Sequence, residues 1–186
     1  MIKAIIFDWH GVLDEVNLEG ALKRASAESK IPLDELKNLL RDINKKYTLG
    51  DMEEGPYWKL VADTLKISEM QAKQLQDYIN SVIQNKELWD YLPELKKKYK
   101  LAILSDCPIE KISSIRKKAD LTLFDHVFFS AEVKLDKSMP EFFDLCANTL
   151  KLDKQEILFT DDNPKIIDFA STLGFKTHLF TNTAEF

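Results

Sequence analysis

Two hydrophobic patterns alternate along the 186-residue chain. The first is a short, mostly apolar run, which is typical of a strand buried in a parallel sheet. Five such runs occur, at residues 2–7, 101–104, 126–129, 157–160 and 176–180. The second pattern, apolar residues at helical spacing, fills the segments between the later runs. This alternation predicts βαβ units, and because crossovers are right-handed we expect one five-stranded parallel sheet with helices on both faces.

Residues 15–83 contain no strand pattern and predict an insert of several amphipathic helices. One helix begins after Pro32, residues 50–55 form a turn, and residues 68–71 match a capping box that opens a later helix. The positions expected to be buried are Leu33, Leu36, Leu39, Leu40, Ile43, Tyr57, Leu60, Val61, Leu65, Met70, Leu75, Tyr78, Ile79 and Val82. We therefore predict an α/β, Rossmann-like core formed by residues 1–14 and 84–186, with a helical domain of residues 15–83 inserted into it.

Proline and glycine mark the ends of helices in the C-terminal part. A helix over residues 88–99 contains Pro93, and a second is predicted near 109–118. Pro140 opens a helix that runs to residue 150, and Pro164 opens one that Gly174 ends as the C′ residue.

Composition narrows the class of protein. Hydrophobic residues make up 45% of the chain and charged residues 31%, which is ordinary for a globular domain. The formal net charge of −5 argues against a general nucleic-acid binder. Both Cys107 and Cys146 are interpreted as reduced thiols. The N-terminal apolar run stops at Asp8, and no run approaches the roughly 20 residues that span a bilayer, so we expect a cytoplasmic protein without a membrane partner.

Three of the predicted strands end on acids or a hydroxyl. Asp8 follows the first strand, Ser105-Asp106 follows the second, and Asp161-Asp162 follows the fourth. Each of these residues alone would suit a helix N-cap or a turn. The carboxyl ends of parallel strands line the ligand crevice of an open α/β sheet, so the three together indicate one site.

Carboxylates gathered in this way repel one another unless a cation lies between them. Mg²⁺ prefers hard oxygen ligands, and Asp8, Asp161 and Asp162 would supply them. Lys137 follows the third strand and can reach the same crevice, while Ser105 and the backbone amides after it can hold a phosphoryl oxygen. A carboxylate nucleophile, a metal, a lysine and a serine form a coherent set for phosphoryl transfer.

Four motifs in order resemble those of the haloacid dehalogenase-like (HAD) superfamily over nearly the whole chain. They are FDWHGVL at 7–13, LSD at 104–106, SAEVKLDKSMPEFF at 130–143 and FTDDNP at 159–164. The helical insert between the first and second motifs is similar to the small cap that closes over the site in one branch of that family.

The resemblance implies a role for each matching residue. Asp8 would be the nucleophile that forms an aspartyl-phosphate. The metal ligands implied are Asp8, Asp161, Asp162 and the backbone carbonyl of His10. The residues implied to bind the phosphoryl group are Ser105, Asp106 and Lys137. Solvent access and substrate choice would depend on the cap.

His10 departs from the family pattern, in which this position is the aspartate that acts as general acid/base. Three alternatives follow. The imidazole replaces the acid, since it titrates near pH 6.5, with Asp14 or the phosphate compensating its charge. The reaction does without that acid, as in dehalogenase-type members. The protein binds phosphate or a partner and turns over poorly.

The acid pair helps to separate the possible reactions. Dehalogenase-type members use the aspartate without a metal, so the retained Asp161-Asp162 pair favours Mg²⁺ and phosphoryl transfer. The opening motif also resembles that of phosphonate-cleaving members, which use a cap lysine. Lys37, Lys45 and Lys46 are instead interpreted as solvated charges on helix faces.

The sequence therefore predicts a Mg²⁺-dependent hydrolase, a phosphatase of a small phosphorylated metabolite. The alternatives are a catalytically impaired phosphate- or partner-binding protein, a dehalogenase-type member, or a phosphomutase that passes the phosphoryl group to a sugar.

Overall fold

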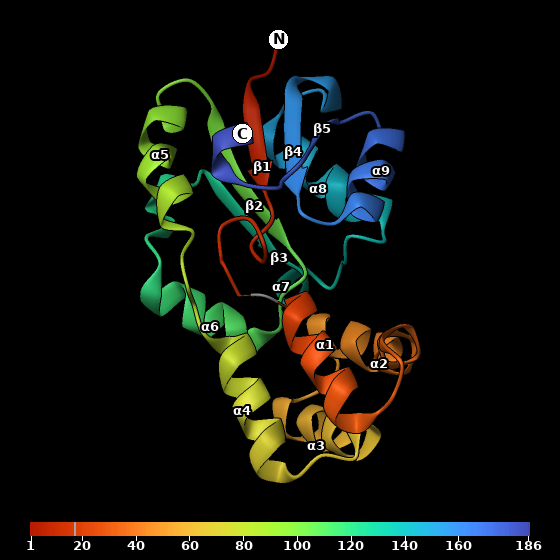
Figure 1. The fold of residues 1–186 in the computed structure, drawn as a ribbon. Helices are drawn as coiled ribbons and strands as arrows, with labels where there is room; N and C mark the ends of the chain where they lie inside the picture. Colours follow the sequence, from red (N-terminus) through yellow and green to blue (C-terminus); the bar gives the residue numbers. More distant parts are fainter. Residues whose placement is uncertain (17) are drawn as a thin grey trace.

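A five-stranded parallel sheet forms the centre of the molecule in the computed structural model, which describes residues 1–16 and 18–186. The strand order is β3-β2-β1-β4-β5. The strands are β1 (Ala4–Phe7), β2 (Lys100–Ser105), β3 (His126–Phe129), β4 (Ile157–Asp161) and β5 (Lys176–Leu179). All five predicted strands and their parallel pairing are confirmed. Their carboxyl ends all lie at one edge, which faces the inserted helices (Figure 1).

Helices cover both faces of this sheet (Figure 1). Those of the sheet layer are α5 (Lys86–Lys96), α6 (Ile109–Lys118), α7 (Ser130–Val133), α8 (Pro140–Leu150) and α9 (Pro164–Thr172). Strand side chains alternate between faces, so Ile5 and Phe7 pack with α5 and α6, while Ala4 and Ile6 pack with α8 and α9. The short 3₁₀ segments are η1 (Leu121–Leu123), η2 (Lys154–Glu156) and η3 (Thr183–Glu185). The predicted layers are thus confirmed.

Four helices between β1 and α5 form a second body beyond the carboxyl edge of the sheet, which we call the cap (Figure 1). They are α1 (Leu18–Ser29), α2 (Leu33–Thr48), α3 (Glu54–Leu65) and α4 (Glu69–Asn80). The predicted capping box is present, since the backbone N–H of Ser68 donates to Gln71 and the Ser68 hydroxyl accepts from the Gln71 N–H. The predicted insert of residues 15–83 includes residue 17, which lies outside the described residues.

Several cap positions differ from the prediction. Leu39, Leu60 and Met70 are 49%, 38% and 70% exposed, whereas the sequence predicts them to be buried. The cap helices bury only a narrow stripe against their own centre, so apolar residues at the edge of that stripe face solvent. The predicted turn ends early because Gly55 already belongs to α3, and Val82 lies beyond the end of α4.

The cap contacts the core through charged side chains. Lys134, after α7, donates to the backbone carbonyls of Leu49 and Gly50 at 2.7 and 2.8 Å. Lys45 of α2 lies 3.0 Å from the Asp136 carboxylate of the core. Lys45 is exposed, as the sequence predicts for a solvated charge, and it also pairs with Asp136 because the loop before α8 approaches that face of α2. The cap is therefore closed on the core in this structure.

The two cysteines are unpaired thiols, as the composition predicts. Cys107 and Cys146 are free and buried, and burial raises the pKa of both thiols. Among the described residues, no helix combines the length and the apolar character that crossing a membrane requires.

Candidate active site

Three carboxylates lie close together at the carboxyl ends of the neighbouring strands β1 and β4. Asp8 directly follows β1 and its N–H donates to the Thr160 carbonyl of β4 at 3.0 Å, while Asp161 is the last residue of β4. Asp8, Asp161 and Asp162 each offer an oxygen, and these oxygens lie within 4.8 Å of one another. A glycine is required opposite them, since Gly11 has a φ of +75° and a Cβ there would lie 2.1 Å from Asp162 Oδ2.

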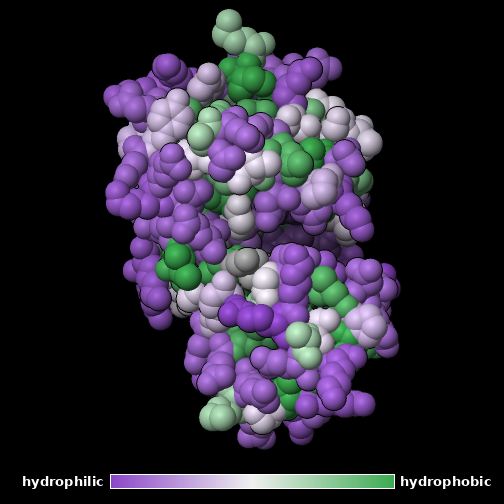
Figure 2. Space-filling model, in the orientation of Figure 1, coloured by the Kyte–Doolittle hydropathy of each residue, from purple (hydrophilic) through white to green (hydrophobic). Residues whose placement is uncertain are grey.

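These carboxylates face a crevice of about 410 Å³. The crevice is lined by Asp8, His10, Gly11, Glu15, Val16, Glu19, Asp106, Lys137, Asp161, Asp162, Asn163 and Ile166. Figure 2 shows a hollow with hydrophilic surroundings between the two bodies of the molecule. Of the seven residues that the sequence singles out, six line this crevice.

Lys137 is the cation of the crevice. Its Nζ lies 2.6 Å from Asp8 Oδ1 and 2.7 Å from Asp161 Oδ2, and its side chain is almost fully buried. Its backbone N–H donates to Asp106 Oδ1 at 3.0 Å. Burial alone would lower the pKa of Lys137, but Asp161, Asp8 and Asp106 together raise it above its ordinary value. The lysine is therefore charged and held between the two strand ends.

Negative charge still exceeds positive charge around Lys137. Burial raises the pKa of Asp106 to about 6 against the opposing effect of Lys137. Burial, Asp8 and Asp161 raise the pKa of Asp162 to about 6, and burial also raises the pKa of Asp161. Carboxylates with raised pKa values and hard oxygen atoms facing one another suit a divalent cation such as Mg²⁺.

His10 lies on the wall of the crevice, with its Nε2 buried and without a hydrogen-bond partner among the described residues. Burial is the main effect that lowers the pKa of His10 to about 3, and the Lys111 charge adds to it while Asp14 opposes it. The sequence leads us to expect titration near pH 6.5, and in this structure the imidazole is neutral there. Asp14 does not serve His10 as a partner but binds Lys111 at 3.0 Å.

Ser105 is the predicted site residue that does not line the crevice. It ends β2, is fully buried, and its hydroxyl has no hydrogen-bond partner among the described residues. Because successive side chains alternate in direction, Asp106 rather than Ser105 reaches the crevice wall.

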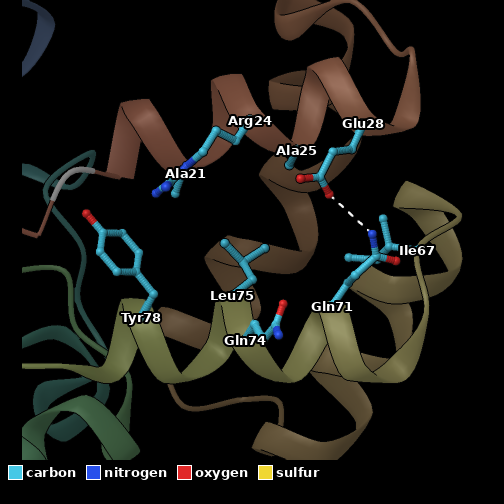
Figure 3. Close-up of a pocket in the computed structure, with 9 residues that line it drawn as sticks. All are labelled: Ala21, Arg24, Ala25, Glu28, Ile67, Gln71, Gln74, Leu75 and Tyr78. Carbon is cyan, nitrogen blue, oxygen red and sulfur yellow. Dashed lines mark hydrogen bonds between the residues drawn. The ribbon is translucent and has the colours of Figure 1, made fainter.

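Two further cavities lie in the cap. One, of about 170 Å³, shares His10 and Asp106 with the crevice. The other, of about 300 Å³, lies between α1 and α4 and shares no residue with the crevice. Figure 3 shows it beside the hydrogen bond from Gln71 to Glu28. We call the cavity that shares residues with the crevice the inner cap cavity, and the other the outer cap cavity. Ala21 and Leu75 line both, so these two residues lie between them.

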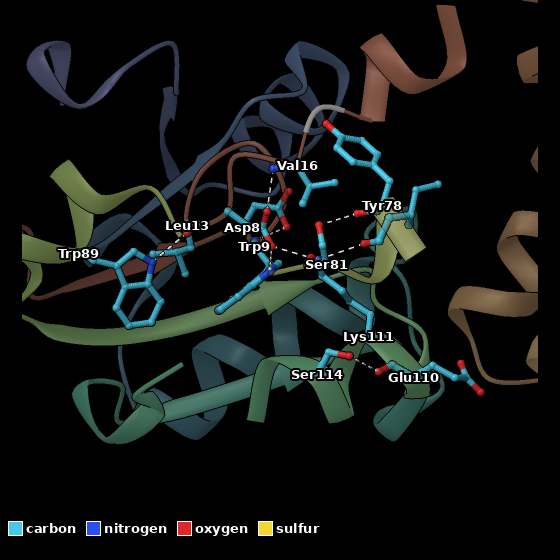
Figure 4. A network of polar contacts seen from close by, with 12 residues as sticks. Asp8, Trp9, Leu13, Val16, Tyr78, Ser81, Trp89, Glu110, Lys111 and Ser114 are labelled. Carbon is cyan, nitrogen blue, oxygen red and sulfur yellow. Dashed lines mark hydrogen bonds and ion pairs between the residues drawn. The ribbon is translucent and has the colours of Figure 1, made fainter. Parts of the chain in front are cut away.

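A buried network behind the crevice was not predicted from the sequence. Lys111 of α6 is fully buried, and its Nζ contacts Asp14 Oδ2 at 3.0 Å and donates to the backbone carbonyls of Ile79 and Ser81 (Figure 4). The indole N–H of Trp9 donates to the same carboxylate at 2.9 Å. The sequence does hold one signal of this burial. Lys111 lies four residues before Ile115, so both residues lie on the same face of α6, and Ile115 is buried.

Comparison with known proteins identifies the family. The family model of the haloacid dehalogenase-like hydrolases matches residues 2–174. A HAD family enzyme of Bacteroides thetaiotaomicron is similar in structure, with a TM-score of 0.76 and 22% identity over 98% of this chain and 95% of its own. That enzyme is also known in complex with magnesium and inorganic phosphate.

Two other solved structures share the fold. A predicted HAD-like family hydrolase from Porphyromonas gingivalis has a TM-score of 0.73 and 23% identity over 98% of this chain and 93% of its own. The L-2-haloacid dehalogenase from Xanthobacter autotrophicus has a TM-score of 0.65 and 24% identity over 95% of this chain and 76% of its own. The family model spans most of the chain, so this protein belongs to the haloacid dehalogenase-like hydrolases.

Proposed function

We propose that the protein is a Mg²⁺-dependent phosphatase of a small phosphorylated metabolite, with Asp8 as the nucleophile. The observation that carries the proposal is the meeting of the Asp8, Asp161 and Asp162 oxygens within 4.8 Å, with Lys137 between two of these residues. The magnesium and phosphate complex of the Bacteroides enzyme supports the same chemistry.

Mg²⁺ would be held by Asp8, Asp161 and Asp162, with the backbone carbonyl of His10 as a further ligand. When bound, the cation would offset the carboxylate charge and polarise the phosphoryl oxygens. The division of the chain into a core of residues 1–14 and 84–186 and a cap of residues 15–83 belongs to this proposal, since the cap would close the crevice against water.

Asp8 is oriented for attack by two donors to its Oδ1, the Trp9 backbone N–H at 2.6 Å and Lys137 Nζ at 2.6 Å. Its carboxylate forms a bond to phosphorus, the ester P–O bond breaks, and the alcohol leaves after its oxygen gains a proton. Water then attacks the phosphorus of the aspartyl-phosphate, which releases inorganic phosphate and restores Asp8. Lys137, with the Asp106 amide, would bind the phosphoryl oxygens, whereas Ser105 lies buried behind the crevice wall.

In this scheme the neutral imidazole of His10 would accept the proton of the attacking water, and the leaving alcohol would take its proton from solvent. Its buried Nε2 has no protein partner among the described residues and stands at the wall shared by the crevice and the inner cap cavity. A polar atom in that position is expected to pair with substrate or with the attacking water.

Two other functions remain as alternatives with distinct expectations. A dehalogenase-type reaction is suggested by the structural likeness to the Xanthobacter enzyme, but it would use Asp8 alone and leave the Asp161 and Asp162 carboxylates without a use. A binding protein with little turnover is suggested by the histidine at position 10, and it would bind Mg²⁺ and phosphate without hydrolysis.

The test is hydrolysis of 4-nitrophenyl phosphate and acetyl phosphate with Mg²⁺ or with EDTA, for wild type and Asp8→Asn. We expect Mg²⁺-dependent turnover that falls at least about 10³-fold in Asp8→Asn, since the nucleophile is lost. Asp168→Asn removes the same charge from an exposed position of α9 and serves as the control.

Wild-type turnover by Asp8→Asn would overturn the proposal. Folded protein that binds Mg²⁺ but hydrolyses neither phosphate compound would favour the binding alternative. Halide release from 2-chloropropionate in EDTA would favour the dehalogenase alternative.

A further inference from the structure

The inner cap cavity has a wall unlike that of the crevice beside it. It is built mainly by aromatic and aliphatic side chains of α2 and α3, among them Leu40, Tyr47, Tyr57, Trp58 and Val61. The rings of Tyr47 and Tyr57 stack at 3.9 Å, and Tyr57 meets Trp58 edge to face at 5.0 Å. Such a packed aromatic wall holds its shape without a ligand.

The cavity contains polar atoms that the protein leaves unpaired. Trp58 is 6% exposed, lines the cavity, and its indole N–H has no hydrogen-bond partner among the described residues. The Nε2 of His10 and the hydroxyl of Tyr47, two other residues that line the cavity, are also unpaired among the described residues. Buried polar groups in proteins are almost always paired, so three unpaired groups around one cavity indicate a ligand that completes them.

Charge and size restrict that ligand. No lysine or arginine is found among the described residues that line the cavity, so a second anionic group on the ligand would lack a partner. Its volume of about 170 Å³ is close to that of a cavity of about 150 Å³ known to admit benzene. One ring or a short branched chain fits there, whereas a sugar or a nucleotide has more hydroxyl and amide groups than this wall can pair.

The cavity adjoins the reaction centre, because His10 and Asp106 line both it and the crevice. On the basis of the proposed function, we propose that this cavity receives the alcohol part of the substrate. The substrate class is then the phosphate monoester of a small, uncharged, mainly apolar or aromatic alcohol that carries an acceptor atom for the Trp58 N–H. Hydrolysis breaks the ester P–O bond, water supplies the oxygen to phosphate, and the alcohol leaves protonated into the cavity.

The test compares kcat/KM for phenyl phosphate, glucose 6-phosphate and acetyl phosphate in wild type, Val61→Phe and Val61→Leu. We expect wild type to favour phenyl phosphate over glucose 6-phosphate at least ten-fold. The ratio of phenyl phosphate to acetyl phosphate should fall at least ten-fold in Val61→Phe and about three-fold in Val61→Leu, because each fills part of the cavity. Leu60→Phe, at the neighbouring exposed position, is the matched control and should keep the wild-type ratio.

A binding measurement separates this inference from the proposed function. Phenol is titrated into each folded variant and followed by tryptophan fluorescence, with Trp58→Phe used to identify the signal of Trp58. Phenol binding that Val61→Phe abolishes supports the cavity even if no phosphate compound is hydrolysed. Hydrolysis of acetyl phosphate without phenol binding, or equal use of phenyl phosphate and glucose 6-phosphate, overturns the inference and leaves the phosphatase intact.

Discussion

Two buried lysines of this protein each contact carboxylates, but they lie in different places and are expected to serve different purposes. Lys137 contacts Asp8 and Asp161 and lies on the wall of the crevice. Lys111 contacts Asp14 where both side chains are fully inaccessible, and it binds the carbonyl groups at the end of α4. One lysine is open to a ligand, whereas the other joins the cap to the core.

The pKa values reflect this difference. Three carboxylates overcome burial at Lys137 and raise its pKa, whereas burial prevails at Lys111 and lowers its pKa despite Asp14. The crevice therefore holds more negative charge than its lysine offsets, and a metal can supply the balance. The Lys111 network is already complete, so a metal should have no effect on it.

The largest expected effect is on stability. Lys111→Met leaves the buried Asp14 carboxylate without its cation and should lower the free energy of unfolding by about 3–5 kcal/mol. Urea denaturation measures this loss, with Lys165→Met, at an exposed position, as the control. Adding Asp14→Asn should recover part of the loss, and a single variant as stable as wild type would show that the pair is not structural.

The second effect is on turnover. Lys137→Met should lower kcat for acetyl phosphate about 10²–10³-fold, because the phosphoryl charge loses its buried cation. Mg²⁺ should restore much of the stability that Lys137→Met loses and none of the stability that Lys111→Met loses. Thermal denaturation with Mg²⁺ or EDTA measures both responses, and equal rescue of the two variants would remove the distinction between the lysines.

The sequence identifies Lys137 and overlooks Lys111 for a physical reason. Lys137 lies in the segment after β3 and α7, at the edge of the parallel sheet where all the strand ends meet. Asp8, Asp161 and Asp162 are predictable in the same way, since an acid that stops an apolar run is conspicuous. Lys111 lies inside an amphipathic helix, where a lysine is normally solvated, and its partner is 97 residues away in the chain.

The cap is less predictable than the sheet for a related reason. Apolar residues at helical spacing have the same pattern whether they fill a core or line a cavity, so Trp58 could not be assigned to a cavity wall from the sequence. Met70 has that spacing and is exposed, because the helix faces solvent there. For Ser105, its position at the end of a strand predicts that the residue lies near the crevice. It does not predict that the side chain points away from the crevice.

The third effect is a pH dependence of stability without metal. Asp106 and Asp162 have pKa values of about 6 in the folded protein and about 4 when unfolded, so the folded state binds more protons between these values. The lowered pKa of His10, about 3, acts in the opposite direction, but the two carboxylates outweigh one imidazole, so stability in EDTA should fall as pH rises from 4 to 6. The fall should be steeper in Lys137→Met, because Lys137 lowers the pKa of both carboxylates, and it should be weaker with Mg²⁺. Urea midpoints at pH 4.5, 5.5 and 6.5 measure it, and a rise over this range would contradict the assignment.

The smallest loss of stability is expected at a third lysine, Lys134. This lysine tests whether burial or the number of contacts decides how much a lysine stabilises the protein. Lys134 donates to Leu49, Gly50 and Asp51 of the cap, as many partners as Lys111 has, but its side chain is 54% exposed. Exposed ion pairs contribute about 0–1 kcal/mol, so Lys134→Met should change the urea midpoint little. If it destabilises the protein as much as Lys111→Met does, then the number of cap contacts, and not burial, decides what each lysine contributes.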